Sequence, residues 1–148
     1  EALGWRALVV EHVGSTAVPG LPAKPVIDVD LVVADPADEA SYVPALEARG
    51  FVLRVREPWW FEHRLLRGTS PTSHVHVFGP DSPEVVKHRI FRDWLRGNPD
   101  ERERYAAAKL AASAASSAAG EHGMQYNARK EQVVRAIYAR AFAATGLA

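Results

Sequence analysis

Two aspartates share one short apolar segment near the start of the chain. Asp28 and Asp30 lie within residues 26–33, whose other members are all apolar. Residues two apart on a strand point to the same face, so the spacing predicts two neighbouring carboxylates. Burying carboxylates without a partner is costly, and a hard divalent cation with oxygen ligands would offset that cost. The pattern therefore predicts a site for Mg²⁺ or Mn²⁺. The alternatives are an edge strand with solvated acids, or an ion pair between Asp28 and Lys24 or an arginine.

A Gly-Ser pair precedes the aspartates and follows the largely apolar residues 7–13. Glycine lets the backbone approach a ligand closely, and backbone N–H groups in such a turn can bind phosphate. We therefore predict that Gly14, Ser15 and Thr16 bind the phosphate part of a substrate. The alternative is a plain turn in which Ser15 or Thr16 caps a short helix.

Two histidines alternate in residues 73–78, which read as a further strand. His74 and His76 then share a face, and His76 is predicted to act as a metal ligand or a general base. An imidazole ligand would favour zinc, among other transition metals, over magnesium. The alternative is a pair of hydrogen-bonded histidines on a half-buried strand.

Several cations could neutralise substrate phosphates. The predicted substrate-binding cations are Lys24, Arg64, Arg89 and Arg92. Arg89 and Arg92 are three apart and would share one helix face. For each cation the alternative is a solvated position or an ion pair, as between Arg92 and Asp93.

The residues 12–21 (HVGSTAVPGL), followed by Ala23-Lys24-Pro25 and Ile27-Asp28, resemble the GrpB family. The later segments 74–77 (HVHV), 89–96 (RIFRDWLR) and 105–109 (YAAAK) are also similar to it. Gly-Ser followed by Asp-x-Asp is typical of the nucleotidyltransferase superfamily. The resemblance implies a nucleotidyltransferase-like fold with Asp28, Asp30 and His76 at its site. Fusion of some family members to a dephospho-coenzyme A kinase domain points to nucleotide or coenzyme metabolism.

One departure from the superfamily bears on the reaction. Its members usually carry a third carboxylate on a later strand, whereas residues 73–78 contain no acid and place His76 or His74 there. The first hypothesis is a metal-dependent nucleotidyl- or phosphoryl-transferase that acts on a small-molecule acceptor. The alternatives are a non-catalytic module that binds a nucleotide or phosphorylated metabolite, and another metal-dependent enzyme, such as a hydrolase or ligase, on the same scaffold.

Length and composition set broader bounds. The 148 residues suit a single domain with its own core. Lys plus Arg equal Asp plus Glu at 18 each, a balance that argues against a nucleic-acid partner. The absence of cysteine excludes thiolate metal sites. No apolar run approaches membrane-spanning length, and we expect a cytoplasmic protein. The first residue is Glu, consistent with a sequence that starts inside the natural protein and lacks an upstream helix.

The order of predicted elements indicates an α/β (α+β) fold, a mixed sheet with helices followed by a C-terminal helical segment. Asp35 and Pro36 predict the start of a helix that ends before Gly50. Residues 60–67 and 73–78 read as a hairpin. Three helices are predicted over residues 82–96, 98–119 and 125–143.

Overall fold

The computed structural model describes residues 2–21, 23–119 and 123–146. Backbone contacts divide the chain into two compact units. The first comprises Glu1–Ala17 with Ala23–Arg89, and the second comprises Val18–Pro22 with Ile90–Ala148. Every strand belongs to the first unit, and the long C-terminal helices belong to the second. The organisation of the chain as a single domain stays a prediction.

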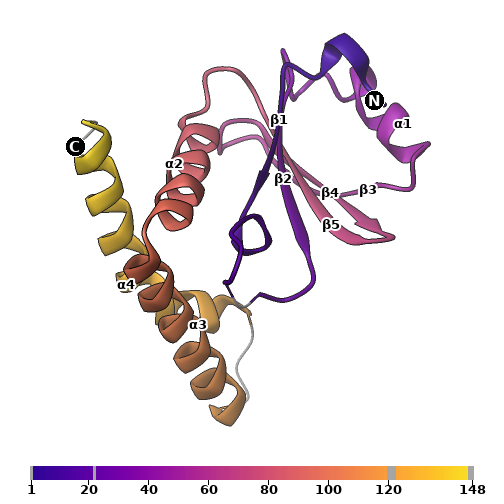
Figure 1. Ribbon diagram of the computed structural model, residues 1–148. Coiled ribbons are helices and arrows are strands. Elements are labelled where there is room, and N and C mark those ends of the chain that lie inside the picture. The colour runs from indigo at the N-terminus through magenta and orange to yellow at the C-terminus, as the bar shows by residue number, and fades with distance from the viewer. Residues whose placement is uncertain (1, 22, 120–122, 147–148) are drawn as a thin grey trace. The chain divides into compact units, whose positions relative to one another are not determined.

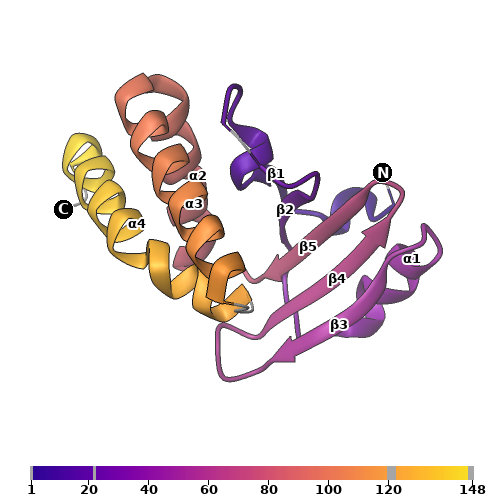
Figure 2. The same ribbon diagram turned by 90° about the horizontal axis from the view of Figure 1, so that it is seen from below.

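The first unit is built on one mixed five-stranded sheet with the order β1-β2-β5-β4-β3 (Figures 1 and 2). β2 and β5 run parallel, and the other neighbouring pairs run antiparallel. β2 is therefore an internal strand, which suits the apolar residues that alternate with and follow its two aspartates. The predicted α+β fold is confirmed. The strands are β1 (Val9–Val13), β2 (Ile27–Val32), β3 (Val52–Glu57), β4 (His63–Thr69) and β5 (Thr72–Phe78).

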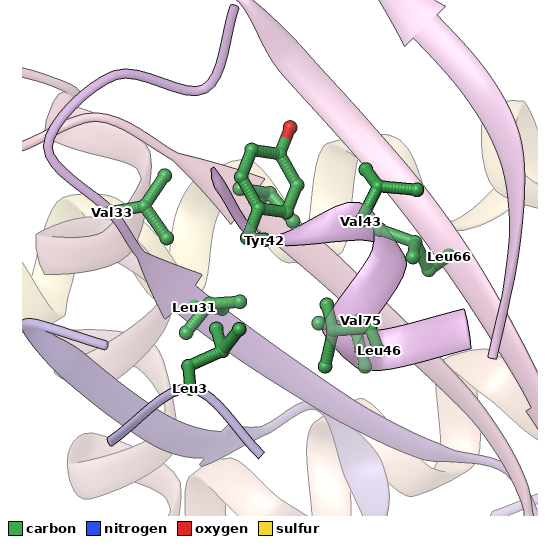
Figure 3. Packing of buried hydrophobic residues seen from close by; sticks show 9 residues of the cluster. Leu3, Leu31, Val33, Tyr42, Val43, Leu46, Leu66 and Val75 are labelled. Atoms are coloured by element: carbon green, nitrogen blue, oxygen red, sulfur yellow. The ribbon is translucent and has the colours of Figure 1, made fainter. Parts of the chain in front are cut away.

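One face of this sheet carries the larger hydrophobic core of the unit. Leu31, Val75 and Leu66 from three adjacent strands contact Tyr42 and Leu46, which lie in and just before the short helix α1 (Val43–Glu47) (Figure 3). Tyr42 and Leu66 have no exposed surface. Close packing of such apolar side chains is the main source of stability for this side of the sheet.

The opposite face holds a smaller apolar cluster and most of the polar residues of interest. Val32 and Phe78, at the ends of β2 and β5, contact Val85 from the first turn of α2 (Pro83–Gly97). The residues that precede Val32 and Phe78 on this face are Asp30 and Asp28 on β2, and His76 and His74 on β5. On this face, apolar residues therefore pack at the C-terminal ends of β2 and β5, and polar residues occupy the earlier positions of the two strands.

The predicted helix from Asp35 to Gly50 was wrong in extent. Asp35 accepts a hydrogen bond from the Ala37 N–H at 3.0 Å, but only the 3₁₀ turn η3 (Glu39–Ser41) and α1 follow. The Tyr42 hydroxyl donates a hydrogen bond to the Pro36 carbonyl at 2.6 Å. In a continuous helix this carbonyl would instead accept a hydrogen bond from a backbone N–H group. The strand predicted from residue 60 begins at His63, because residues 58–62 form a turn.

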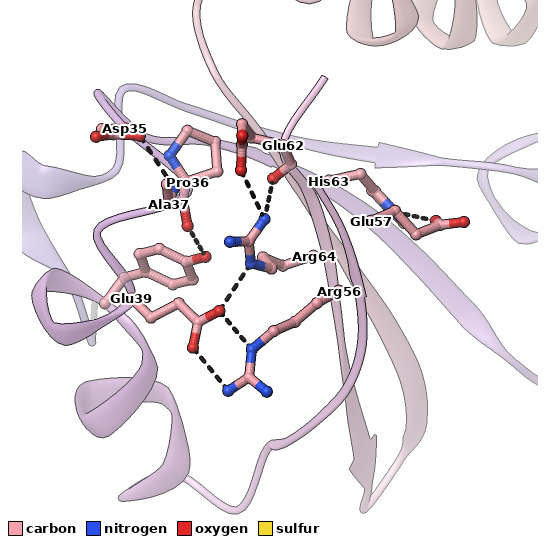
Figure 4. A network of polar contacts seen from close by, with 10 residues as sticks. Asp35, Pro36, Ala37, Glu39, Arg56, Glu57, Glu62, His63 and Arg64 are labelled. Atoms are coloured by element: carbon pink, nitrogen blue, oxygen red, sulfur yellow. Dashed lines mark hydrogen bonds and ion pairs between the residues drawn. The ribbon is translucent and has the colours of Figure 1, made fainter. Parts of the chain in front are cut away.

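Ion pairs attach η3 to the sheet (Figure 4). The Glu39 carboxylate accepts hydrogen bonds from Arg56 at 2.6 and 2.9 Å and from Arg64 at 2.8 Å. The hydrogen bond from Arg56 is the main cause that lowers the pKa of Glu39 to about 2, with Arg64 adding to it. Glu39 is therefore a charged anchor for β3 and β4 at neutral pH.

The second unit consists of the C-terminal half of α2 together with α3 (Pro99–Ala119) and α4 (Gly123–Thr145). Leu95, Tyr105 and Ile137 form its apolar centre. Glu101 is almost fully buried and accepts hydrogen bonds from Arg140 at 2.8 and 2.9 Å, which hold its pKa at about 2. The three predicted C-terminal helices are confirmed. Among the described residues, no helix has both the length and the apolar character needed to cross a membrane.

Candidate functional site

The parallel pairing of β2 with β5 brings the predicted site residues together. Asp28 lies beside His74 and Asp30 beside His76 in the register of the two strands. Paired residues on neighbouring strands point to the same face, so all four side chains share it. Asp28 Oδ1 lies 3.4 Å from His76 Nε2 and 3.7 Å from His74 Nδ1, and the Asp28 side chain is 32% exposed. This arrangement gives a solvent-accessible carboxylate next to two imidazoles.

Asp30 has a different environment from Asp28. Its side chain is completely buried, and its Oδ2 accepts a hydrogen bond from His88 Nδ1 on α2 at 2.7 Å. Its Oδ1 is also buried and has no hydrogen-bond partner among the residues that the structure describes. Burial works against protonation of His88, but the hydrogen bond and charge of Asp30 outweigh it and raise the His88 pKa. Asp30 therefore anchors α2 to the sheet through His88.

Gly14 packs directly against the first aspartate. Its φ of +75° is a conformation that favours glycine, and an added Cβ would lie 2.7 Å from Asp28 Oδ2. The next residues form the 3₁₀ turn η2 (Ser15–Ala17). The predicted Gly-Ser turn and the Asp-x-Asp strand are thus in contact, and the glycine is needed there because a carboxylate occupies the space of a side chain.

Thr16 holds the loop that links this turn to β2. Its hydroxyl donates to the Val26 carbonyl at 3.4 Å, and the same oxygen is 2.9 Å from His12 Nε2. The sequence-predicted role of Thr16 in substrate binding stays a prediction, while the structure gives the residue a role in the loop.

The predicted cations are dispersed. Lys24 is exposed in the loop before β2, and Arg89 is exposed on α2. Arg64 lies on the opposite face of the sheet, where Glu39 and Glu62 hold its guanidinium. The Arg92 Nε donates to Asp93 Oδ1 at 2.9 Å, as the alternative interpretation expected, and Arg92 belongs to the second unit.

The donor set at Asp28 fits part of a divalent-cation site. A cation about 2.1 Å from both Asp28 Oδ1 and His76 Nε2 would see these atoms, 3.4 Å apart, at an angle of about 110°. However, no three His, Cys, Asp or Glu side chains within the described ranges are grouped to hold a metal. Mg²⁺ commonly binds through one or two carboxylates and completes its shell with water and substrate phosphates. Asp28 and His76 therefore suit a cation that arrives with phosphates better than a permanent cage.

Two further residues extend the site, and neither was predicted from the sequence. His63 Nε2 lies 3.3 Å from His76 Nδ1, and His63 Nδ1 lies 2.7 Å from Glu57 Oε1. Burial lowers the His63 pKa, although the hydrogen bond to Glu57 opposes that shift. His63 and His76 are on adjacent antiparallel strands, and only the register of β4 against β5 brings them together. The sequence did place His63 on the predicted hairpin, but it did not indicate to which face of the sheet this side chain points.

Comparison with known proteins gives consistent results. The family model described as "GrpB protein" matches residues 1–140. The UPF0157 protein BH1888 of Halalkalibacterium halodurans is 55% identical over 107 residues, which are 72% of this chain and 55% of that protein. The chain thus spans little more than half the length of this relative. A protein named dephospho-CoA kinase from Mycolicibacterium paratuberculosis is 36% identical over 95% of this chain and 40% of its own length.

The fold has a counterpart among solved structures. The crystal structure of conserved protein GrpB from Enterococcus faecalis matches with a TM-score of 0.78 and 28% sequence identity. The match covers 97% of this chain and 86% of the other. Because the family model matches residues 1–140 of the 148 in this chain, the chain belongs to the GrpB family.

Proposed function

We propose that the protein transfers a nucleotidyl or phosphoryl group to a small-molecule acceptor. The observation that carries this proposal is the contact between Gly14 and Asp28. It joins a turn suited to phosphate with a carboxylate that remains accessible to solvent. Catalysis of such transfers depends mainly on positioning and on electrostatic stabilisation, both of which this arrangement can provide.

Each part of the site has a role in the proposed reaction. The backbone at Gly14 and the hydroxyl of Ser15 would bind phosphate oxygens. Asp28, with His76 as a second ligand or as the general base, would bind the cation that accompanies the phosphates. When bound, that cation (Mg²⁺ or Mn²⁺, or Zn²⁺ if His76 is a ligand) would neutralise charge on the transferred group. Lys24 and Arg89, the predicted cations that are exposed in the first unit, could add to this neutralisation.

The relatives suggest which phosphates to try first. Part of each dephospho-CoA kinase relative aligns with most of this chain, and that name refers to a nucleotide-containing coenzyme precursor. The balanced charge of the chain favours a small phosphorylated ligand over a nucleic acid. We therefore expect a nucleoside triphosphate or a coenzyme-like phosphate to bind at Asp28.

A second candidate function is a non-catalytic binding module for the same ligands. It is favoured by one feature of β5, whose residues 72–78 contain no carboxylate. A third carboxylate would normally complete a two-metal site or provide a base. The histidines could instead support a different metal-dependent reaction, such as hydrolysis or ligation.

Calorimetric titration tests the proposal. Nucleoside triphosphates and dephospho-CoA are titrated, with Mg²⁺ or Mn²⁺, into the wild type and into Asp28→Asn. Glu47→Gln is the matched control, because it removes an exposed acid from α1 on the other side of the sheet. We expect cation-dependent binding that Asp28→Asn weakens at least tenfold and Glu47→Gln leaves unchanged. Absence of binding to any of these ligands by the folded wild type would overturn the proposal.

Turnover separates the enzyme from the binding module. Incubation of the bound triphosphate with pools of hydroxyl- and amine-bearing metabolites is followed by ³¹P NMR. Release of pyrophosphate, the product of nucleotidyl transfer, or of a nucleoside diphosphate, the product of phosphoryl transfer, supports transfer if it depends on Asp28. Binding without any release across the pools supports the module.

A further inference from the structure

A chain of close polar contacts between side chains leads from the end of β3 to Asp28. Glu57 contacts His63 at 2.7 Å, His63 contacts His76 at 3.3 Å, and His76 lies 3.4 Å from Asp28. Figure 4 shows the first of these contacts, between Glu57 and His63. His63 is only 4% exposed, so water has little access to the middle of the chain.

The two imidazole rings are placed for a hydrogen bond between them. Their planes are inclined by 21°, and their centroids are 5.5 Å apart. A face-to-face stack in van der Waals contact would have a separation of about 3.5–4.0 Å. The longer separation suits rings whose nitrogens approach edge to edge. The turn that delivers His63 includes Phe61 and Glu62, both with positive φ, so the backbone is held in an uncommon conformation at this point.

Counting protons along these contacts limits the tautomers that the two histidines can adopt. A carboxylate can only accept, so Glu57 requires a proton on His63 Nδ1. Burial favours the neutral ring, whose Nε2 is then unprotonated and can accept a hydrogen bond from His76 Nδ1. A His76 ring whose one proton is on Nδ1 presents an unprotonated Nε2 to Asp28 Oδ1. Two acceptors face each other there without a proton between them.

We propose that Glu57, acting through His63, is a positioning residue that holds His76 in the Nδ1–H tautomer. The Nε2 lone pair of His76 and the carboxylate of Asp28 then form a paired acceptor site. Such a site takes a group that has a proton to share, and a hydroxyl of the acceptor molecule fits this chemistry. The identity of that ligand rests on the proposed function, whereas the tautomer does not.

The tautomer can be measured without any ligand. Two-bond ¹H–¹⁵N correlation spectra of ¹⁵N-histidine-labelled protein are recorded near pH 8.5, well above the ordinary histidine pKa of about 6.5. The His76 signals are assigned by their loss in His76→Gln. We expect a protonated Nδ1 and an unprotonated Nε2 in the wild type. A protonated Nε2 on His76 in the wild type would overturn the proposal.

Glu57→Gln reverses the chain in a predictable way. A Gln amide can donate to His63 Nδ1, which moves the His63 proton to Nε2 and the His76 proton to Nε2. The new His76 Nε2–H can then donate to Asp28, so the reversed direction is favoured. We expect His76 to change tautomer in Glu57→Gln and to keep it in the control Glu47→Gln. An unchanged His76 tautomer in a folded Glu57→Gln protein would refute the positioning role. If that variant does not fold, His63→Phe, which removes the acceptor for His76 Nδ1, provides the same test.

A binding measurement links the tautomer to function. For any nucleotide that the wild type binds with Mn²⁺, Glu57→Gln is expected to weaken affinity or activity by about 10- to 100-fold, the usual effect of residues that orient a site. If no nucleotide binds but the tautomer changes as expected, the proposed function fails and the positioning role stands. If a nucleotide binds and the tautomer does not change, the positioning role fails alone.

Discussion

Replacing Gly14 with alanine tests why glycine precedes the serine of the turn. Two costs follow from the structure. The φ of +75° places an alanine in the left-handed region, at a cost of about 1–2 kcal/mol. The added Cβ would also lie 2.7 Å from Asp28 Oδ2, and such overpacking costs about 1–3 kcal/mol. We therefore expect Gly14→Ala to lower the free energy of unfolding by about 2–5 kcal/mol.

Gly50→Ala is the matched control. Gly50 belongs to the same unit, has a φ of +91°, and would have nothing within 4 Å of an added Cβ. It therefore has the backbone cost without the collision, and we expect a loss of about 1–2 kcal/mol. Urea denaturation followed by circular dichroism gives both values. Equal losses for the two variants would refute the contact with Asp28 as the reason for the glycine.

A double-mutant cycle isolates the collision. Asp28→Ala removes the Oδ2 and Cγ atoms that the new Cβ would meet at 2.7 and 3.3 Å, but leaves the Asp28 Cβ at 3.2 Å. Gly14→Ala should therefore cost less in this background, by about 1 kcal/mol or more, without becoming free. Gly50→Ala should cost the same with and without Asp28. Additive losses for Gly14→Ala and Asp28→Ala would contradict the argument.

Two other predictions concern carboxylates that the structure holds in opposite environments. Glu39 has its pKa lowered to about 2 from 4.5, so its ion pairs add stability above about pH 4.5 and lose it as the pH falls towards 2. Because Arg56 is exposed, we expect Glu39→Gln to lower the free energy of unfolding by only about 1–2 kcal/mol at pH 7, and by little near pH 2. Urea denaturation of the wild type and the variant at both pH values measures this loss, and an equal loss at the two pH values would contradict the prediction. Asp30→Asn removes the charge that outweighs burial at His88, so the His88 pKa should fall below its ordinary value in an NMR titration, and a raised pKa that persists would show that Asp30 is not its cause.

The sequence was informative where local pattern decides structure. The two-residue spacing of Asp28 and Asp30 and the Gly-Ser turn before them predicted that Gly14 and Asp28 belong to one site. The partners His63 and His88 were missed, because they come from a hairpin and a helix more than 30 residues further along the chain. Their positions depend on strand register and on helix docking, which single-sequence patterns do not determine. Arg64 shows the same limit, because whether it faced the aspartates depended on the strand register.

The two aspartates of the motif show that a shared face does not mean a shared environment. Asp28 lies where the polar part of the face is open to solvent, while Asp30 lies one step closer to the apolar cluster and under α2. A cation or phosphate can therefore reach Asp28 without any rearrangement, whereas Asp30 would first have to release His88. A variant that changes both residues would combine loss of a ligand with loss of a helix anchor. Asp28→Asn alone reports on binding, and Asp30→Asn alone reports on the attachment of α2, so the two substitutions need to be made and measured separately.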